Sequence, residues 1–212
     1  MNIYILKNEN SENLLPFMSE QRLEKINDIT SEKVKEEKIC AYALLRYAVF
    51  MEYGITEAPV FKYGEREKPY LENIPHIFFS LSHAGGYSAC VVSDFEIGID
   101  LQDFRPMKDN ISCKICTKKE ILEIYSGDNG GPSFSTCRLW CMKESYGKLT
   151  GKGFAEGFDT IETSELNEKG ILKEKDIVLE NNDFFLSVCG NEPVDDIEII
   201  TVSEKDVRYI LS

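Results

Sequence analysis

The sequence lacks the features that mark secreted, membrane-spanning or nucleic-acid-binding proteins. Its first residues form a short apolar run without a basic start, so we expect no secretory signal. No run reaches the roughly 18 apolar residues that a membrane span requires. Basic residues are scarce: 24 lysines and arginines stand against 37 acidic residues, for a net charge of −13. Nucleic-acid binders usually carry the opposite balance, so we expect a cytoplasmic protein without nucleic-acid or membrane partners.

The cysteines are odd in number, seven in all, and without a secretory signal we expect free thiols in a reducing compartment. Cys113, Cys116, Cys137 and Cys141 have a spacing that a zinc site can use. The alternative is that each pair is small apolar filler on one face of a helix. We favour the alternative, because Cys137 and Cys141 fall inside a predicted helix and motif matches of this kind carry a high false-positive risk.

The composition is sufficient for a folded core. An apolar content of 42% and an aromatic content of 11% argue against disorder. At 212 residues the chain has room for one large domain or two small ones.

The periodicity of apolar residues predicts alternating helices and short strands. We expect helices at 11–29, 31–52 (ended by Gly54) and 136–150, and a loop at 127–132. Strands are expected at 2–6, 77–83, 87–92, 97–102, 157–164, 171–179, 184–189 and 197–202. The three strands between 77 and 102 are joined by short turns, which indicates an antiparallel meander.

The order of these elements repeats along the chain. A long helix at 31–52 precedes the strands at 87–92 and 97–101, and a long helix at 136–150 precedes those at 184–189 and 197–202. The sequence therefore predicts an α+β fold of two similar halves, 1–103 and 104–212. Each half is expected to pack a long helix on a small antiparallel sheet, with a site at the seam that uses residues of both.

One stretch stands out chemically. Glu144 and Lys148 lie one helical turn apart, an arrangement that is usually no more than a solvated ion pair. Here the pair follows Trp140, the only tryptophan of the chain. The strings Gly98-Ile99-Asp100 upstream and Gly151-Lys152-Gly153 downstream add further unusual features. This combination favours a functional site.

His83 allows two interpretations. A single histidine after a strand is often a satisfied core residue. The two glycines that follow, Gly85 and Gly86, permit close approach of a ligand to the backbone, and turn N–H groups can hold phosphate. The residue alone does not decide between the two.

Together, Gly98-Ile99-Asp100 and the stretch from Trp140 to Lys148 resemble the signature of the 4′-phosphopantetheinyl transferases, and the closest type is the surfactin-synthetase-activating one. Ser82-His83 and Lys68-Pro69 match further strings of that family. The resemblance covers about residues 17–202. It implies a pseudo-dimer of two α/β halves in which coenzyme A binds between them.

The resemblance implies Mg²⁺-dependent transfer of phosphopantetheine from coenzyme A to a serine of an acyl or peptidyl carrier protein, with release of 3′,5′-ADP. Asp100 and Glu144 match the magnesium ligands, and Glu120 matches a further acidic position near the metal. Gln102 stands where this type often has a glutamate ligand. Glu144 is also a candidate general base, and Lys148 is expected to bind phosphate and stabilise the leaving oxygen.

Other matching positions belong to the nucleotide end of coenzyme A. By resemblance, Arg22 and Lys25 hold the 3′-phosphate, while Lys68, Pro69, Ser82 and His83 contact the nucleotide and its phosphates. Two departures concern this end. Glu67 replaces a common glycine, and Tyr42 replaces a common arginine, for which Arg46 is a candidate substitute one turn further on.

Two other functions remain open at this point. One is a coenzyme A-binding homologue with weakened catalysis, and the other is an unrelated metal-dependent phosphoesterase that uses the same carboxylates. The sequence does not name the carrier, since fatty-acid, polyketide and nonribosomal peptide systems all fit. As a pseudo-dimer, the protein is expected to act as a monomer.

Overall fold

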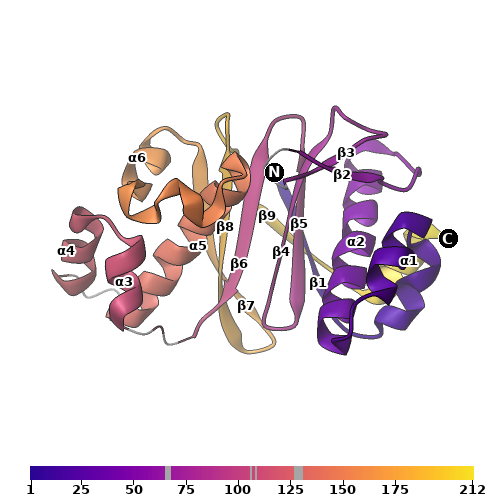
Figure 1. Ribbon diagram of the computed structural model, residues 1–212, viewed down its shortest axis with the longest axis horizontal. Coiled ribbons are helices and arrows are strands. Elements are labelled where there is room, and N and C mark those ends of the chain that lie inside the picture. The colour runs from indigo at the N-terminus through magenta and orange to yellow at the C-terminus, as the bar shows by residue number, and fades with distance from the viewer. Residues whose placement is uncertain (65–67, 106, 108, 127–130) are drawn as a thin grey trace. The chain divides into compact units, whose positions relative to one another are not determined.

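The computed structural model describes residues 1–212 except 65–67, 106, 108 and 127–130. Glu67 and most of the loop expected at 127–132 therefore lie outside the described residues. Helices and small sheets alternate along the chain (Figure 1), which confirms the predicted α+β class.

The chain folds into two compact units, residues 1–97 with 198–212 and residues 98–197. We call them the first and the second unit. This division differs from the expected halves 1–103 and 104–212 in two ways. The second unit begins at residue 98 rather than 104, and residues 198–212 belong to the first unit. The reason is strand pairing: β6 (Ile97–Asp103) joins the sheet of the second unit, and β9 (Glu198–Val202) joins that of the first.

The first unit contains a four-stranded sheet in the order β4-β5-β1-β9 and a two-stranded sheet, β2-β3. The bounds of the strands not yet given are β1 Asn2–Lys7, β2 Phe61–Tyr63, β3 Pro69–Leu71, β4 Phe78–Ala84 and β5 Tyr87–Ser93. Strand β1 runs antiparallel to β5 but parallel to β9. The larger sheet is therefore mixed, whereas the repeat predicted an antiparallel one.

Helix α2 (Glu32–Tyr53) is the long helix predicted at 31–52. Ser31 caps its start by accepting a hydrogen bond from the Val34 N–H, and Gly54 ends it with a φ of 68°. The helix packs against β1, β4 and β5 (Figure 1), and its buried face is the centre of the large apolar core of this unit.

The helix predicted at 11–29 is divided in two. A 3₁₀ segment, η1 (Ser11–Phe17), contains Pro16 and precedes α1 (Glu20–Asn27), which Ser19 caps. The division follows from local chemistry, because proline disfavours a continuing α-helix and a serine cap begins a new one. The C-terminal helix α7 (Glu204–Leu211) completes this unit beside η1 and α2.

Strands β4 and β5 form the hairpin expected from the sequence. Ala84 pairs with Tyr87, which leaves Gly85 and Gly86 as a two-residue turn with φ of 54° and 85°. Positive φ at both turn residues matches the twist of the flanking strands, and glycine adopts it without strain. Ser82 and His83 consequently lie at the end of β4, beside this turn.

The second unit has a three-stranded sheet in the order β6-β8-β7. Its other elements are α3 (Asp109–Ile115), α4 (Lys118–Ser126), α5 (Pro132–Thr150), η2 (Gly153–Glu156), η3 (Phe158–Thr160), α6 (Thr163–Glu168), β7 (Leu172–Leu179) and β8 (Asn182–Gly190). Helix α5 packs on β8.

Two sequence predictions are wrong in this unit. Strand β6 does not extend a β4–β5 meander, because its partner is β8. The strand expected at 157–164 is instead η3 followed by the start of α6. Gly157 has a φ of 72°, which bends the chain where an extended strand was expected.

Within the described ranges, no helix combines the length and the apolar character that crossing a membrane requires.

Candidate active site

Strand β6 carries Asp100 into close proximity with helix α5. Gly98, two residues earlier, makes this possible: a Cβ there would lie 2.1 Å from the Ser145 carbonyl oxygen and 2.5 Å from the Leu149 nitrogen. Only glycine permits such an approach of strand to helix. The Cys141 thiol contacts the Asp100 carbonyl oxygen at 3.3 Å, so the helix touches the backbone of Asp100 as well.

Helix α5 begins with Pro132 and ends at Gly151, whose φ is 70°. It presents Lys148 to Asp100, with 2.7 Å between the Lys148 Nζ and the Asp100 Oδ1. The Asp100 side chain is 8% exposed and that of Lys148 is 30% exposed. The pair is therefore shielded at the carboxylate and open at the ammonium.

Glu144 lies one turn before Lys148 on α5 and is half-buried. Burial raises the pKa of its carboxyl above the ordinary value of 4.5, and the negative charge of Asp100 raises this pKa further. Lys148 opposes both effects. Two carboxyl groups and one ammonium thus influence each other in a partly desolvated site, which is typical of groups that exchange protons or bind cations.

Gln102 lies two residues after Asp100 on β6. Its Nε2 donates to the Asp103 carbonyl oxygen at 3.0 Å and to the Asp103 Oδ1 at 3.3 Å. The amide nitrogen is therefore held by the neighbouring residue. The role of Gln102 as a metal ligand stays a prediction.

Glu120 is 1% exposed, and both of its carboxylate oxygens are engaged. Oε2 accepts hydrogen bonds from the Thr117 N–H and the Lys143 ammonium, and Oε1 accepts from the N–H and hydroxyl of Thr163. These contacts involve α4, α5 and α6. The expected proximity of Glu120 to a metal stays a prediction, whereas its partnership with Lys143 is observed.

Asp100 and Glu144 fit a magnesium ion in chemical terms. Mg²⁺ takes oxygen ligands, and one or two carboxylates suffice because it also keeps waters and binds substrate phosphates. The described residues contain no group of three or more histidine, cysteine, aspartate or glutamate side chains arranged to hold a metal ion. The roles of Asp100 and Glu144 as Mg²⁺ ligands stay a prediction.

The predicted nucleotide-binding residues belong to the first unit. Arg22 on α1 is 9% exposed, and its guanidinium lies 5.7 Å from the centre of the Tyr42 ring and 4.9 Å from that of Phe61. The Lys25 Nζ lies 4.3 Å from the centre of the Tyr63 ring. Arg22 and Lys25 therefore rest on aromatic side chains, an arrangement that orients a cation.

The remaining predicted positions lie at the β-strands of this unit. Lys68 forms an ion pair with Glu96 at 3.4 Å, and Pro69 begins β3. Ser82 is buried, whereas the exposed His83 ring has its Nδ1 3.7 Å from Glu37 Oε2. The expected binding to a nucleotide stays a prediction for all of them.

Arg46, the candidate substitute for the arginine that Tyr42 replaces, forms hydrogen bonds to backbone carbonyl oxygens. Its Nη1 donates to the Phe17 carbonyl oxygen at 2.7 Å and its Nη2 to that of Thr56 at 3.2 Å. Tyr42 is fully buried and donates its hydroxyl to the Pro59 carbonyl oxygen at 2.8 Å. Arg46 thus holds backbone segments together, and Tyr42 supports the Arg22 guanidinium.

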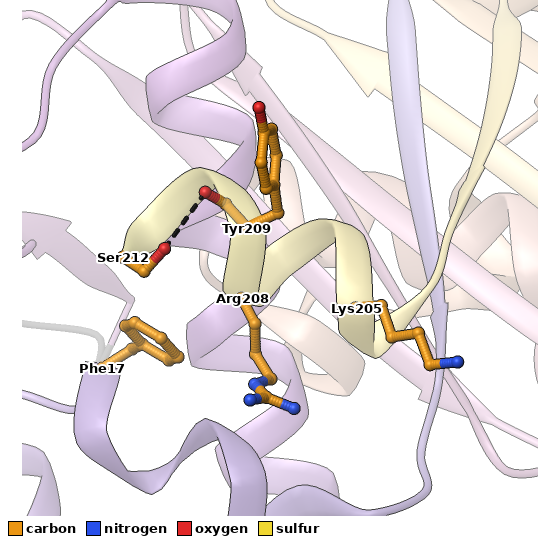
Figure 2. A pocket seen from close by; sticks show the side chains of 5 residues that line it. All are labelled: Phe17, Lys205, Arg208, Tyr209 and Ser212. Carbon is orange, nitrogen blue, oxygen red and sulfur yellow. Dashed lines mark hydrogen bonds between the residues drawn. The ribbon is translucent and has the colours of Figure 1, made fainter.

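A shallow cavity of about 290 Å³ lies elsewhere on the first unit. Figure 2 shows its lining by Phe17, by Lys205, Arg208 and Tyr209 of α7, and by Ser212, which follows that helix. None of the predicted site residues lines it.

Sequence reasoning missed the role of Lys143. Its neighbour Glu144 is half-buried, but Lys143 is 0% exposed. Its partner Glu120 is 23 residues away, and no local pattern signals such a pairing.

Comparison with known proteins adds the family context. Residues 96–195 match the model of the 4′-phosphopantetheinyl transferase superfamily. The 4′-phosphopantetheinyl transferase Sfp of Bacillus subtilis (strain 168) is 26% identical over 157 residues, which cover 74% of this chain and 70% of that protein.

Two further relatives have the same activity in their names. A 4′-phosphopantetheinyl transferase of Bacillus subtilis is 25% identical over 206 residues, or 90% of this chain and 91% of that protein. The 4′-phosphopantetheinyl transferase psf-1 of Bacillus pumilus is 30% identical over 128 residues, covering 60% of this chain and 54% of that protein. The resemblance and the enzyme class predicted from the sequence are confirmed: the chain is similar to 4′-phosphopantetheinyl transferases, among them Sfp of Bacillus subtilis.

Proposed function

We propose that this protein transfers the 4′-phosphopantetheine group of coenzyme A to a serine hydroxyl of an acyl or peptidyl carrier protein and releases 3′,5′-ADP. The observation that supports this most is the Asp100–Lys148 pair with Glu144 one turn away. It lies within the residues that match the superfamily. The carriers of fatty-acid, polyketide and nonribosomal peptide synthesis are all candidate partners.

In this reaction the serine oxygen attacks the β-phosphorus of coenzyme A. The bond between that phosphorus and the oxygen bridging to the α-phosphate breaks, and 3′,5′-ADP leaves. Glu144 receives the serine proton, a role that its raised pKa favours, because a base is most effective when its pKa approaches the working pH. Lys148 places its ammonium against the phosphate oxygens, where negative charge develops.

Asp100 and Glu144 are the residues that would hold Mg²⁺, which neutralises charge on the pyrophosphate when bound. Asp100 also orients Lys148, because its Oδ1 accepts the hydrogen bond from the ammonium. Gln102 and Glu120 complete the predicted metal set, Gln102 through its carbonyl oxygen.

For the nucleotide end, we propose that Arg22 and Lys25 bind the 3′-phosphate. Lys68, Pro69, Ser82 and His83 would contact the remainder. These six residues all belong to the first unit, whereas Asp100, Glu144 and Lys148 belong to the second. A pseudo-dimer with one active site formed by both halves accounts for this distribution and is part of the proposal.

The proposal also includes a monomer that works in the cytoplasm. All seven cysteines are free, as in a reducing compartment.

Mass spectrometry tests the function directly. Several apo carrier domains are incubated with the protein, coenzyme A and Mg²⁺, and we expect one carrier serine to gain one phosphopantetheine mass while 3′,5′-ADP appears. Measurable coenzyme A binding without transfer to any carrier class would indicate the weakened homologue instead. Hydrolysis of coenzyme A in the absence of a carrier would indicate a phosphoesterase.

A further inference from the structure

A buried ion pair, Lys143–Glu120, is the strongest feature of the second unit that the proposed mechanism does not use. Lys143 is 0% exposed and Glu120 is 1% exposed. Lysine and glutamate are almost never buried to this extent unless they are paired. Removing both charges from water is costly, and the cost is recovered only when the geometry satisfies every donor and acceptor.

The pair is satisfied in this way. An ammonium has three donors, and that of Lys143 reaches Glu120, the Ile115 carbonyl oxygen at 2.7 Å and the Phe158 carbonyl oxygen at 2.8 Å. The Glu120 carboxylate accepts three further hydrogen bonds, one from Thr117 and two from Thr163. Each partner therefore has a complete set of contacts.

These contacts join segments that are far apart in sequence. Ile115 ends α3, Glu120 is in the first turn of α4, Phe158 begins η3 and Thr163 begins α6. The hydrogen bonds of this network reach α5 through one side chain, that of Lys143. A shift of α5 along or around its axis would break several of these bonds at once.

The same face of α5 is fitted to its surroundings one turn further on. Gly147 follows Lys143 by four residues, and a Cβ there would lie 3.0 Å from Gly153 Cα and 3.3 Å from the Phe158 ring. Glu144 directly follows Lys143, and Lys148 directly follows Gly147. Each therefore lies about 100° further around the helix than the residue before it. The segment 153–158 thus supports one face of α5 while the adjacent face presents Glu144 and Lys148.

Gly98 on β6 restricts the position of α5 on the side of the helix that faces the sheet. The strand backbone is already so close to Ser145 and Leu149 that a Cβ does not fit. The position of α5 relative to Asp100 is therefore determined by β6 and by the Lys143 network together.

We infer that Lys143 and Glu120 are positioning residues for the transfer reaction: their ion pair holds α5 so that Glu144 and Lys148 meet Asp100 in the reactive arrangement. This inference rests on the proposed function and gives Glu120 a role that does not require metal contact. Buried ion pairs are weak stabilisers and are often replaced by apolar residues without loss of stability. A structural role alone therefore does not account for a network of this completeness.

The test uses the neutral double variant Lys143→Met/Glu120→Gln in the full chain. Methionine has a volume close to that of lysine, and glutamine keeps an acceptor for Thr163, so neither charge remains buried without a partner. We expect kcat to fall ten- to a hundredfold, since a displacement of about 1 Å can cost a hundredfold. The KM for coenzyme A should stay within about twofold, because the predicted nucleotide residues are untouched.

Lys173→Met is the matched control. Lys173 belongs to the same unit and its half-exposed side chain lies 3.8 Å from Asp196, so the same lysine-to-methionine change outside the buried network should leave kcat and KM as in the parent. A folded double variant with kcat within twofold of the parent would show that the pair serves stability only. A parallel loss of coenzyme A affinity and kcat would also overturn the positioning role.

Glu120→Asp covers the case in which the double variant does not fold. It keeps both charges but shortens the carboxylate by one methylene, so we expect a folded protein with lowered kcat and unchanged KM. Unchanged kcat in this variant contradicts the inference.

Hydrogen exchange supplies a readout that does not depend on catalysis. In the double variant, or in Glu120→Asp if that is the folded one, amides of α5 at 143–148 should exchange faster, while those of β7 and β8 stay as in the parent. Unchanged exchange in α5 would overturn the inference. A parent that transfers to no carrier would overturn the proposed function, and the exchange measurement would still decide whether the pair positions α5.

Discussion

The two long helices bury different chemistry. Every buried residue of α2 is apolar or aromatic. Helix α5 instead buries Lys143, Ser145 and Thr136, and it carries the half-buried Glu144 and Lys148. The apolar clusters around α5 are also smaller than the single large core around α2.

The difference shows that a long helix packed on a sheet can serve as structural support, as α2 does, or can carry reactive side chains, as we propose for α5. The polar groups of α2, such as the Tyr42 hydroxyl and the Arg46 guanidinium, are bound to backbone carbonyl oxygens and hold loops in place. Those of α5 also pair with polar side chains of other elements: Lys143 meets Glu120, Ser145 meets Ser187, and Lys148 meets Asp100. Glu144 lies beside the last of these pairs, and burial together with the charge of Asp100 raises the pKa of its carboxyl.

Glu144→Gln should have the largest effect on kcat. It tests whether α5, unlike α2, carries residues that take part in the reaction. Removing a general base that also contributes a ligand charge should lower kcat by at least a hundredfold. Excess Mg²⁺ should rescue this loss poorly. The exposed Glu123 on α4 provides the control Glu123→Gln, which should behave as the parent in the same carrier-modification assay.

The same substitution has a pH-dependent effect on stability. The folded-state pKa of Glu144 is raised, so its contribution to stability is fully present below the unfolded pKa and is lost as the pH rises through the folded one. Glu144→Gln should therefore be more stable than the parent at pH 7, with the gap closing below about pH 4.5. Denaturant unfolding at several pH values measures this, and a less stable variant at pH 7 would contradict the assigned environment.

Arg22→Ala tests the other side of the comparison, namely whether the first unit binds rather than reacts. Losing a charged hydrogen bond of about 1.5–3 kcal/mol should weaken coenzyme A binding ten- to a hundredfold. Dephospho-coenzyme A, which lacks the 3′-phosphate, should lose much less, and Lys25→Ala should show the same pattern. Calorimetric titration of both ligands decides, since equal losses would remove these residues from the 3′-phosphate.

Tyr42→Phe is the matched control for that experiment. It removes the hydroxyl that donates to Pro59 but keeps the ring beside the Arg22 guanidinium. Coenzyme A affinity should therefore remain close to that of the parent.

Substitution of two glycines by alanine compares how closely α5 and the end of α2 are packed. Gly98→Ala places a Cβ against the backbone of α5, and we expect a loss of about 3 kcal/mol, the upper end for overpacking. Gly54→Ala after α2 meets no atom within 4 Å but keeps a φ of 68°, which should cost about 1 kcal/mol. Urea unfolding of both variants tests the order, and a larger loss at Gly54 would reverse it.

Gln102→Glu should have the smallest effect. A hard cation prefers an anionic oxygen, so the variant should bind Mg²⁺ a few-fold more tightly if Gln102 is a ligand. The benefit should appear as activity at sub-saturating Mg²⁺ and disappear when metal is abundant. Magnesium titrations that superimpose for variant and parent would remove Gln102 from the metal site while leaving Asp100 and Glu144 in place.

Local signals were sufficient for two features of the first unit. Helix α2 follows from its Ser31 cap and its Gly54 end, and the β4–β5 hairpin follows from Gly85 and Gly86. Both are determined by neighbouring residues, so the sequence alone predicted them. The resemblance to a family then selected Asp100, Glu144 and Lys148, of which Asp100 and Lys148 are in direct contact and Glu144 lies close enough for their charges to shift its pKa.

Other errors concern partners that are distant in sequence. Strand β6 was placed next to β5 because short turns favour that pairing, but its partner β8 follows some 80 residues later. Thr163 begins a helix partly because Glu120 accepts its N–H and hydroxyl. Lys143 is buried for the same reason, since its counterion belongs to another helix. No window of neighbouring residues contains this information.

The pairing of β1 with β9 has a consequence for biosynthesis. Residues 2–6 and 198–202 are neighbours in one sheet, so β1 has no β9 partner until the ribosome has made all the residues between them. Contacts of such sequence separation slow folding, because a long loop must close before they form. A nascent chain can complete the second unit, 98–197, before the first, and loss of the last fifteen residues would damage the first unit, at the opposite end of the chain.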